Sequence, residues 1–125
     1  MATVEEQVKR DLGREGLTSM VADFYRRVKE DDLIGPMYPE DDWEGSEERL
    51  LDFLCFRLLG ESAYLLKRGH PRLRMRHAPF SIGEAERDRW LEMMEAAMIE
   101  TKVPDDTREA LGAFFTQVAD FMRNQ

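Results

Sequence analysis

Apolar side chains recur at the spacing of an α-helix along most of this chain, and this periodicity restricts the fold more than any other feature. In the first long stretch they fall at i, i+3, i+4, i+7 and i+11, which places them on one helical face. These residues are Leu17, Met20, Val21, Phe24 and Val28. The alternating pattern of a strand is scarce, and its one instance, "RLRMRH" at 72–77, is short and lies between prolines. The sequence therefore predicts an all-α fold.

Three further stretches carry the same helical spacing. Their apolar residues are Leu50, Leu51, Leu54 and Leu58 in the second, Trp90, Met93, Met94, Ala97 and Met98 in the third, and Leu111, Phe114, Phe115, Val118, Phe121 and Met122 in the fourth. Gly60 follows the second stretch as a C-terminal glycine does, and Pro104 lies near the start of the fourth, where proline is tolerated. Ser81 to Glu84 reads S-x-x-E, which predicts a capping box at the start of the third helix. We expect four main helices and a short N-terminal one, in a single domain over residues 1–125.

Composition and charge argue against several classes of protein. The chain has 125 residues, 42% of them hydrophobic, and a net charge of −8. It can build a core, but it does not suit a general binder of nucleic acid or of a membrane surface. No run of about 18 apolar residues is present, so we expect no membrane-spanning helix. The single cysteine, Cys55, lies in an apolar run and is expected to be buried. The N-terminus lacks an apolar signal core, which predicts a cytoplasmic protein.

The segment between the second and third helices, residues 61–82, is unusual. It contains both histidines of the chain, His70 and His77, and a cluster of basic residues between Lys67 and Arg76. Compact domains rarely hold so long an irregular segment without a functional reason. We therefore interpret it as part of a binding site.

Two histidines seven residues apart do not suit a site for one small metal ion. Even on one continuous helix they would be about 10 Å apart along the axis, whereas ligands lie about 2 Å from a zinc ion. The chain has no H-E-x-x-H motif, no cysteine pair and no Gly-rich phosphate loop. The acidic run at 39–48 also lacks the pattern of an EF-hand. A haem iron, by contrast, needs only one axial imidazole from the protein, together with an apolar slot and cations for the propionates.

His77 suits the axial position on this reasoning. The nearby apolar residues would wall the porphyrin, and the nearby arginines would pair with its propionates. The apolar residues are Leu73, Phe80 and Ile82. The propionate partners are Arg76 and, with it, Arg72 or Arg74. A capping or surface role is nevertheless the commoner one for a lone histidine, so the spacing alone leaves both interpretations open.

The same segment resembles the group II truncated haemoglobins. "GHPRLRMRHAPFSIGEAERDRWL", from Gly69 to Leu91, is similar to the proximal segment of that family. Three other motifs agree in order and spacing. They are "FYRRV" at 24–28 on the first long helix, "MYPEDD" at 37–42 at the tyrosine turn, and "EERLLDFL" at 47–54 on the distal helix. The resemblance covers roughly residues 15–100 and implies a two-over-two α-helical sandwich around haem b.

The resemblance implies a role for each matching residue. His77 corresponds to the proximal iron ligand, Tyr25, Tyr38 and Trp90 to residues that face the bound ligand, and Ser46 to the distal gate position. The expected haem pocket consists of Ser46, Leu50, Phe53, Leu54, Leu73, Phe80 and Ile82, and the expected propionate partners are Arg49 and Arg76.

The implied function is reversible binding of dioxygen and of other diatomic ligands, carbon monoxide and nitric oxide. Bound dioxygen carries partial negative charge, so hydroxyl and indole donors aimed at it in a dry pocket would slow its release. Slow release suits nitric oxide oxidation or peroxide reduction better than oxygen carriage. Either reaction needs a separate reductase, because the chain has no flavin or nicotinamide fingerprint.

A haem-free helical interaction module of globin shape is the alternative. It predicts that His77 is replaceable and that Arg72–Arg76 contact an acidic partner protein. Three polar aromatic residues facing an empty slot argue against it. The sequence leaves both a monomer and a homodimer open, and no nucleic-acid or membrane partner is expected.

Overall fold

The structure is a computed structural model, which describes residues 2–61 and 82–123. Over these residues the α-helices are α1 (Val4–Asp11), α2 (Gly13–Lys29), α3 (Trp43–Leu59), α6 (Glu84–Glu100) and α7 (Asp105–Met122). One turn of 3₁₀ helix, η1 (Gly35–Met37), lies between α2 and α3. No strand occurs in the described part of the chain, and the prediction of an all-α fold is confirmed.

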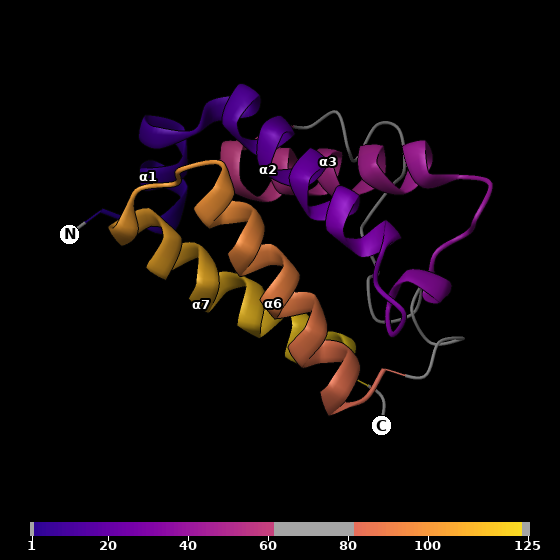
Figure 1. Cartoon of the computed structure of the whole chain (residues 1–125). Helices are drawn as coiled ribbons and strands as arrows, with labels where there is room; N and C mark the ends of the chain where they lie inside the picture. Colours follow the sequence, from indigo (N-terminus) through magenta and orange to yellow (C-terminus); the bar gives the residue numbers. More distant parts are fainter. Residues whose placement is uncertain (1, 62–81, 124–125) are drawn as a thin grey trace.

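The helices form two layers of two (Figure 1). α2 packs against α3 in one layer, and α6 packs against α7 in the other. The layers meet where α2 contacts α6, and α1 packs against α3 and α7 at one end. This arrangement is the two-over-two sandwich that the resemblance implies. None of the helices in the described ranges is long and apolar enough to cross a membrane.

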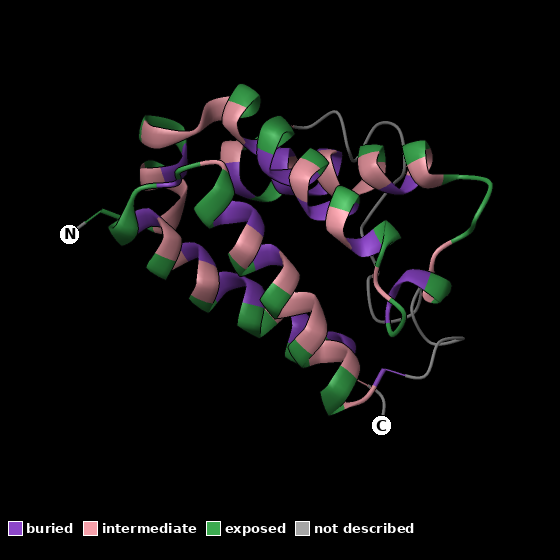
Figure 2. Ribbon diagram, in the orientation of Figure 1, coloured by how far each residue is buried: buried purple, intermediate pink, exposed green. Residues whose placement is uncertain are grey.

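The core lies between the layers and confirms most of the predicted apolar faces. Buried positions recur on the sides of the helices that face other helices (Figure 2). The largest fully buried side chains are Phe24, Phe115, Leu17, Met20, Leu54, Leu58, Met94, Met98, Leu111, Val8, Val21 and Val28. Cys55 is buried, as expected. Phe121, which the spacing placed on the buried face of the last helix, is instead 55% exposed.

Two glycines with a positive φ angle set the ends of helices. Gly60 caps the C-terminus of α3 at φ 72°, as the sequence predicted. Gly13, at φ 65°, lets the chain turn between α1 and α2.

The predicted capping box of the third long helix uses other residues. α6 begins at Glu84, directly after its N-cap Gly83, and the Gly83 N–H donates to Glu86 Oε1 at 2.7 Å. The carboxylate that completes this box is therefore Glu86, whereas the prediction assigned it to Glu84. Glycine is a permitted N-cap residue although it has no side chain to accept a hydrogen bond, so the S-x-x-E pattern named the wrong pair.

Several predicted site residues lie outside the described residues. They are His77, Leu73, Phe80 and Arg76, and their roles stay predictions. The division into a single domain over residues 1–125 also stays a prediction.

Candidate ligand-binding pocket

One cavity of about 370 Å³ lies among α2, α3, α6, α7 and the turn around η1. Nine of the residues that line it were predicted as site residues. They are Tyr25, Tyr38, Ser46, Arg49, Leu50, Phe53, Leu54, Ile82 and Trp90. The structure thus brings together residues from separate motifs of the sequence at one mostly apolar cavity.

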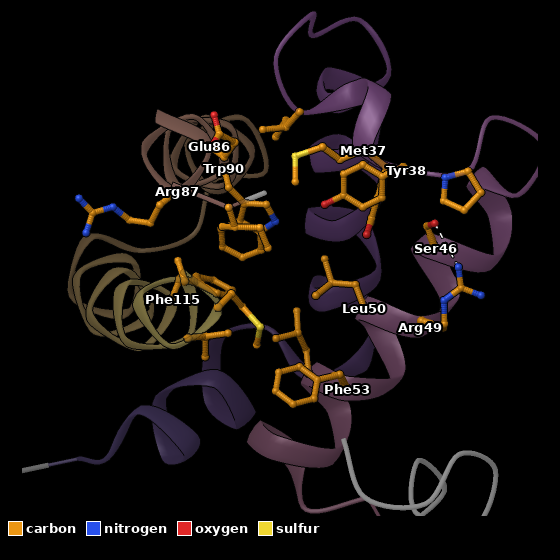
Figure 3. Close-up of a pocket in the computed structure, with 18 residues that line it drawn as sticks. Met37, Tyr38, Ser46, Arg49, Leu50, Phe53, Glu86, Arg87, Trp90 and Phe115 are labelled. Atoms are coloured by element: carbon orange, nitrogen blue, oxygen red, sulfur yellow. Dashed lines mark hydrogen bonds between the residues drawn. The ribbon is translucent and has the colours of Figure 1, made fainter. Parts of the chain in front are cut away.

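The three predicted donors come from three different elements. Tyr25 is on α2 and is 5% exposed, Tyr38 follows η1, and Trp90 is on α6. The rings of Tyr25 and Tyr38 meet edge to face, with their centroids 5.5 Å apart and their planes at 85°. In Figure 3, Tyr38 and Trp90 project into the space between the helices from opposite sides. All three polar side chains therefore line the same cavity.

Both tyrosines stay protonated at neutral pH. Burial, and after it the neighbouring Tyr38, raises the pKa of the Tyr25 hydroxyl. Burial also raises the pKa of Tyr38, although hydrogen bonds from Trp90 and Tyr25 lower it in part. A phenol that keeps its proton is a hydrogen-bond donor. The pocket can therefore offer hydroxyl and indole donors to a ligand that carries negative charge.

Neighbouring aromatic rings hold the donors in place. Trp90 packs between Phe24 and Phe115, with centroid distances of 5.1 and 5.6 Å. Tyr38 packs against Trp43, with the centroids 5.5 Å apart, and Lys29 Nζ lies 5.9 Å from the centroid of the Trp43 ring. The contacts of Trp90 are edge to face and that of Tyr38 with Trp43 is tilted at 31°, and such aromatic contacts favour defined ring orientations. The donors are thus fixed by packing as well as by their own hydrogen bonds.

One face of α3 forms a wall of the pocket. Ser46, Leu50, Phe53 and Leu54 recur at i, i+4, i+7 and i+8, the spacing of one helical face. Ser46 is 5% exposed. Its small side chain leaves more room at this position than a histidine would.

Arg49 lies on the same helix, next to the wall. Its Nη2 donates to Ser46 Oγ at 3.2 Å, and its Nη1 donates to Asp42 Oδ2 at 3.2 Å. The Asp42 carboxylate also caps α3 by accepting from the Gly45 N–H. Since both partners of the Arg49–Asp42 pair are exposed to solvent, their ion pair is weak. The guanidinium can therefore exchange Asp42 for another carboxylate.

Other lining residues were not predicted as site residues. They are Ile34, Met37, Pro39, Glu86, Arg87, Phe115, Val118, Ala119 and Met122. Arg87 lines the cavity through its stem, because its guanidinium points away (Figure 3) and pairs with Asp120 at 2.5 Å. Phe115 and Val118 were recognised as apolar positions of the last helix, but the periodicity gave no sign that this helix faces the cavity. Trp43, which packs against Tyr38 without lining the cavity, lies in the acidic run at 39–48, where no apolar periodicity pointed to it.

The described residues fit a haem group. A porphyrin needs apolar walls, and a ligand bound to its iron is held by polar hydrogens. Leu50, Phe53 and Leu54 supply part of the wall, the two tyrosines and Trp90 supply the polar hydrogens, and Arg49 supplies a cation. This combination of buried donors in a mostly apolar cavity suits a polar ligand bound there.

Comparisons with known proteins agree with the site. Residues 11–124 match the family described as bacterial-like globin. The group 2 truncated hemoglobin YjbI of Bacillus subtilis is 36% identical over 114 residues, which cover 91% of this chain and 86% of that protein.

Solved structures agree in fold as well. The hemoglobin of the thermophilic phototrophic bacterium Chloroflexus aurantiacus matches with a TM-score of 0.87 and 40% identity, over 100% of both chains. A truncated oxygen-avid haemoglobin from Bacillus subtilis matches with a TM-score of 0.87 and 34% identity, over 93% of this chain and 98% of that one. Globins of this family carry haem b and bind diatomic gases such as oxygen, so a haem-free module is not favoured. This chain belongs to the bacterial-like globin family, as a group II truncated haemoglobin.

Proposed function

We propose that this globin retains dioxygen tightly and uses it, or another diatomic ligand, in redox chemistry with a separate reductase. One observation carries the proposal. The hydroxyls of Tyr25 and Tyr38 and the indole of Trp90 line a single apolar cavity. Three donors around one small ligand would slow its release, which suits ligand chemistry better than simple carriage.

Each residue has a separate part in this proposal. Haem supplies an iron at which a diatomic gas binds. His77 would hold the haem iron, and Arg49 and Arg76 would bind the propionates through charge-assisted hydrogen bonds. The apolar walls are Leu50, Phe53, Leu54, Leu73, Phe80 and Ile82. They exclude water, and Ser46 leaves room at the entrance.

The donors stabilise negative charge on the ligand. A hydrogen bond of this kind contributes about 1 to 1.5 kcal/mol, which is roughly a tenfold change in the rate of ligand release when it acts only on the bound state. Water is scarce among the apolar walls, so the interaction is stronger than it would be in solvent. Because burial keeps Tyr25 and Tyr38 protonated, neither hydroxyl becomes a repulsive anion at neutral pH.

Slow release points to ligand chemistry rather than to bulk oxygen transport. The related structure from Bacillus subtilis is described as that of an oxygen-avid haemoglobin, which supports tight retention here. Nitric oxide oxidation and peroxide reduction both need electrons, and the chain has no flavin or nicotinamide motif of its own. A separate reductase would supply them, in a cytoplasmic setting. The globin acts as a monomer or a homodimer in this proposal.

Dioxygen release from the reduced, loaded protein tests the proposal. Trp90→Phe keeps a ring at this position and removes only the N–H, so we expect release to become about tenfold faster while haem is retained. Stopped-flow displacement of dioxygen by carbon monoxide measures the rate. A release rate equal to that of the unmodified protein would remove Trp90 from the distal role.

A further inference from the structure

One ion pair ties the turn that carries Tyr38 to the helix that carries Trp90. Arg89 Nη1 lies 3.3 Å from Asp31 Oδ1, and the Asp31 side chain is only 7% exposed. Arg89 directly precedes Trp90 on α6, and Asp31 lies just after α2, at the start of the chain segment that leads to Tyr38. The pair therefore links two segments that are far apart in sequence and that supply two of the three donors.

Asp31 also orders the turn itself. Its Oδ2 accepts from the backbone N–H groups of Leu33 at 3.1 Å and of Ile34 at 2.9 Å. Its backbone carbonyl accepts from the Gly35 N–H at 3.1 Å. Ile34 is buried and lines the pocket. One carboxylate oxygen thus shapes the turn while the other binds α6.

Asp31 is a better partner for Arg89 than the nearest alternative. Glu92, one turn further along α6, lies 3.8 Å from Arg89 Nε, and its side chain is 68% exposed. A charge pair with a buried partner is screened less by solvent and salt than a fully exposed pair. The buried carboxylate also needs a cation, because an unpaired buried charge is costly. The contact between the turn and α6 is therefore held at a defined point.

We propose that Asp31 and Arg89 are positioning residues that set the placement of the Tyr38 hydroxyl relative to the Trp90 indole. A hydrogen bond weakens steeply as its angle departs from linear. A small slip of the turn along α6 would misalign both donors, although neither Asp31 nor Arg89 lines the cavity. The consequence for ligand release rests on the proposed function of the two donors, whereas the placement itself does not.

The variants Asp31→Asn, Arg89→Gln and the double variant remove the charge pair and little else. Asparagine still accepts hydrogen bonds from the backbone of the turn, and glutamine keeps a polar side chain on α6. Arg108→Gln is the matched control. Arg108 Nε lies 3.4 Å from Glu95 Oε1 and joins α7 to α6 over a similar distance, but this pair does not involve the turn that carries Tyr38.

The first measurement is the NMR signal of the Trp90 indole N–H in the carbon monoxide complex. The chain has two tryptophans, so Trp90→Phe assigns the signal. We expect the signal to shift, and its exchange with solvent to accelerate about three- to tenfold, in each single variant. We expect no change in Arg108→Gln, and a partial return toward the unmodified signal in Arg89→Lys, which restores the charge.

The second measurement is dioxygen release. Each single variant should release dioxygen about three- to tenfold faster, and the double variant no faster than either single one, because both substitutions break the same contact. Lower thermal stability with an unmoved indole signal would mean a purely structural pair and would overturn the proposal. If the indole signal moves but release is unchanged, in these variants and in Trp90→Phe, the placement stands and the donor role in the proposed function fails.

Discussion

At the scale of single residues, the orientation of Tyr38 depends on a tryptophan outside the cavity lining. The Tyr38 ring packs against both Trp43 and Tyr25, and both centroid distances are 5.5 Å. Trp43→Ala would leave a gap behind Tyr38. We expect it to lower the free energy of unfolding by about 1 to 2 kcal/mol, less than a fully buried tryptophan, because Trp43 is only partly buried. Urea unfolding measures this loss.

Ligand release separates the support of Tyr38 from general stability. Trp43→Ala should also release dioxygen several-fold faster, since a loosened hydroxyl aligns poorly with the ligand. Trp43→Phe is the matched control, because it keeps an aromatic ring beside Tyr38 and should stay close to the unmodified rate. Equal release rates in Trp43→Ala and the unmodified protein would show that Tyr38 needs no support from this side.

A second prediction at this scale concerns His77, which lies outside the described residues. If it is the axial ligand, His77→Ala should bind haem weakly or lose it, because the variant lacks the imidazole that would hold the iron. The Soret absorbance per protein, before and after reduction and addition of carbon monoxide, measures this. His70→Ala is the matched control and should keep its haem. Unchanged haem content and an unchanged spectrum in His77→Ala would refute the assignment.

At the scale of the helices, two glycines of α3 and α7 should respond in opposite directions to the same change. Gly60 has a φ of 72°, and Gly112 lies inside α7 with an ordinary negative φ. A Cβ at either position meets no atom within 4 Å, so only the backbone decides the outcome. Gly60→Ala should cost about 1 kcal/mol of stability, whereas Gly112→Ala should add about 0.5 to 1 kcal/mol. Urea unfolding of the two variants tests the opposite signs, and a loss of stability in both would contradict the role of the backbone.

Helical periodicity predicted which elements form but not where each one ends. The apolar stripes around Leu17 and Leu54 correspond to α2 and α3, because burial on one face imposes the spacing. α3 nevertheless begins at Trp43, inside the acidic run, since charged residues are acceptable on the outer face of a first turn. Phe121 has the helical spacing of the buried residues of α7, but it is exposed. Spacing predicts on which face of a helix a residue lies, but not whether a neighbouring helix covers that face along its whole length.

At the scale of the whole molecule, the candidate site was predictable only through the order of several motifs. Tyr25, Tyr38 and Trp90 each suited an ordinary core or turn position, and no local pattern places them together. The structure brings them to one cavity because α2 packs against α6. Two contacts were not predictable: the Asp31–Arg89 ion pair and the packing of Trp43 on Tyr38. Each joins side chains that helix packing brings together, and sequence spacing does not show which helices pack against each other.

The first and last helices, α1 and α7, are joined by a contact that depends on pH. Thr107, fully buried on α7, donates to Asp11 Oδ2 of α1 at 2.5 Å. Hydrogen bonds from Arg10 and then from Thr107 lower the pKa of Asp11 to about 2. A lowered pKa in the folded state means that Asp11 stabilises the fold above its unfolded pKa of about 3.9. This contribution is lost as the pH falls from about 4 toward 2.

Thr107→Val should therefore weaken the fold near neutral pH and make its stability less dependent on pH in this range. The valine keeps the shape of the side chain but cannot donate to Asp11, so the pKa of Asp11 rises toward its unfolded value and less stabilisation remains to be lost in acid. Urea unfolding between pH 2 and 5 measures the slope. Thr116→Val, on the exposed side of α7, is the matched control, since Thr116 donates only to the Gly112 carbonyl of its own helix. If the stability of Thr107→Val falls with pH as steeply as that of the unmodified protein, Arg10 alone sets the pKa of Asp11. The hydrogen bond from Thr107 would then join α1 to α7 whether or not Asp11 is charged.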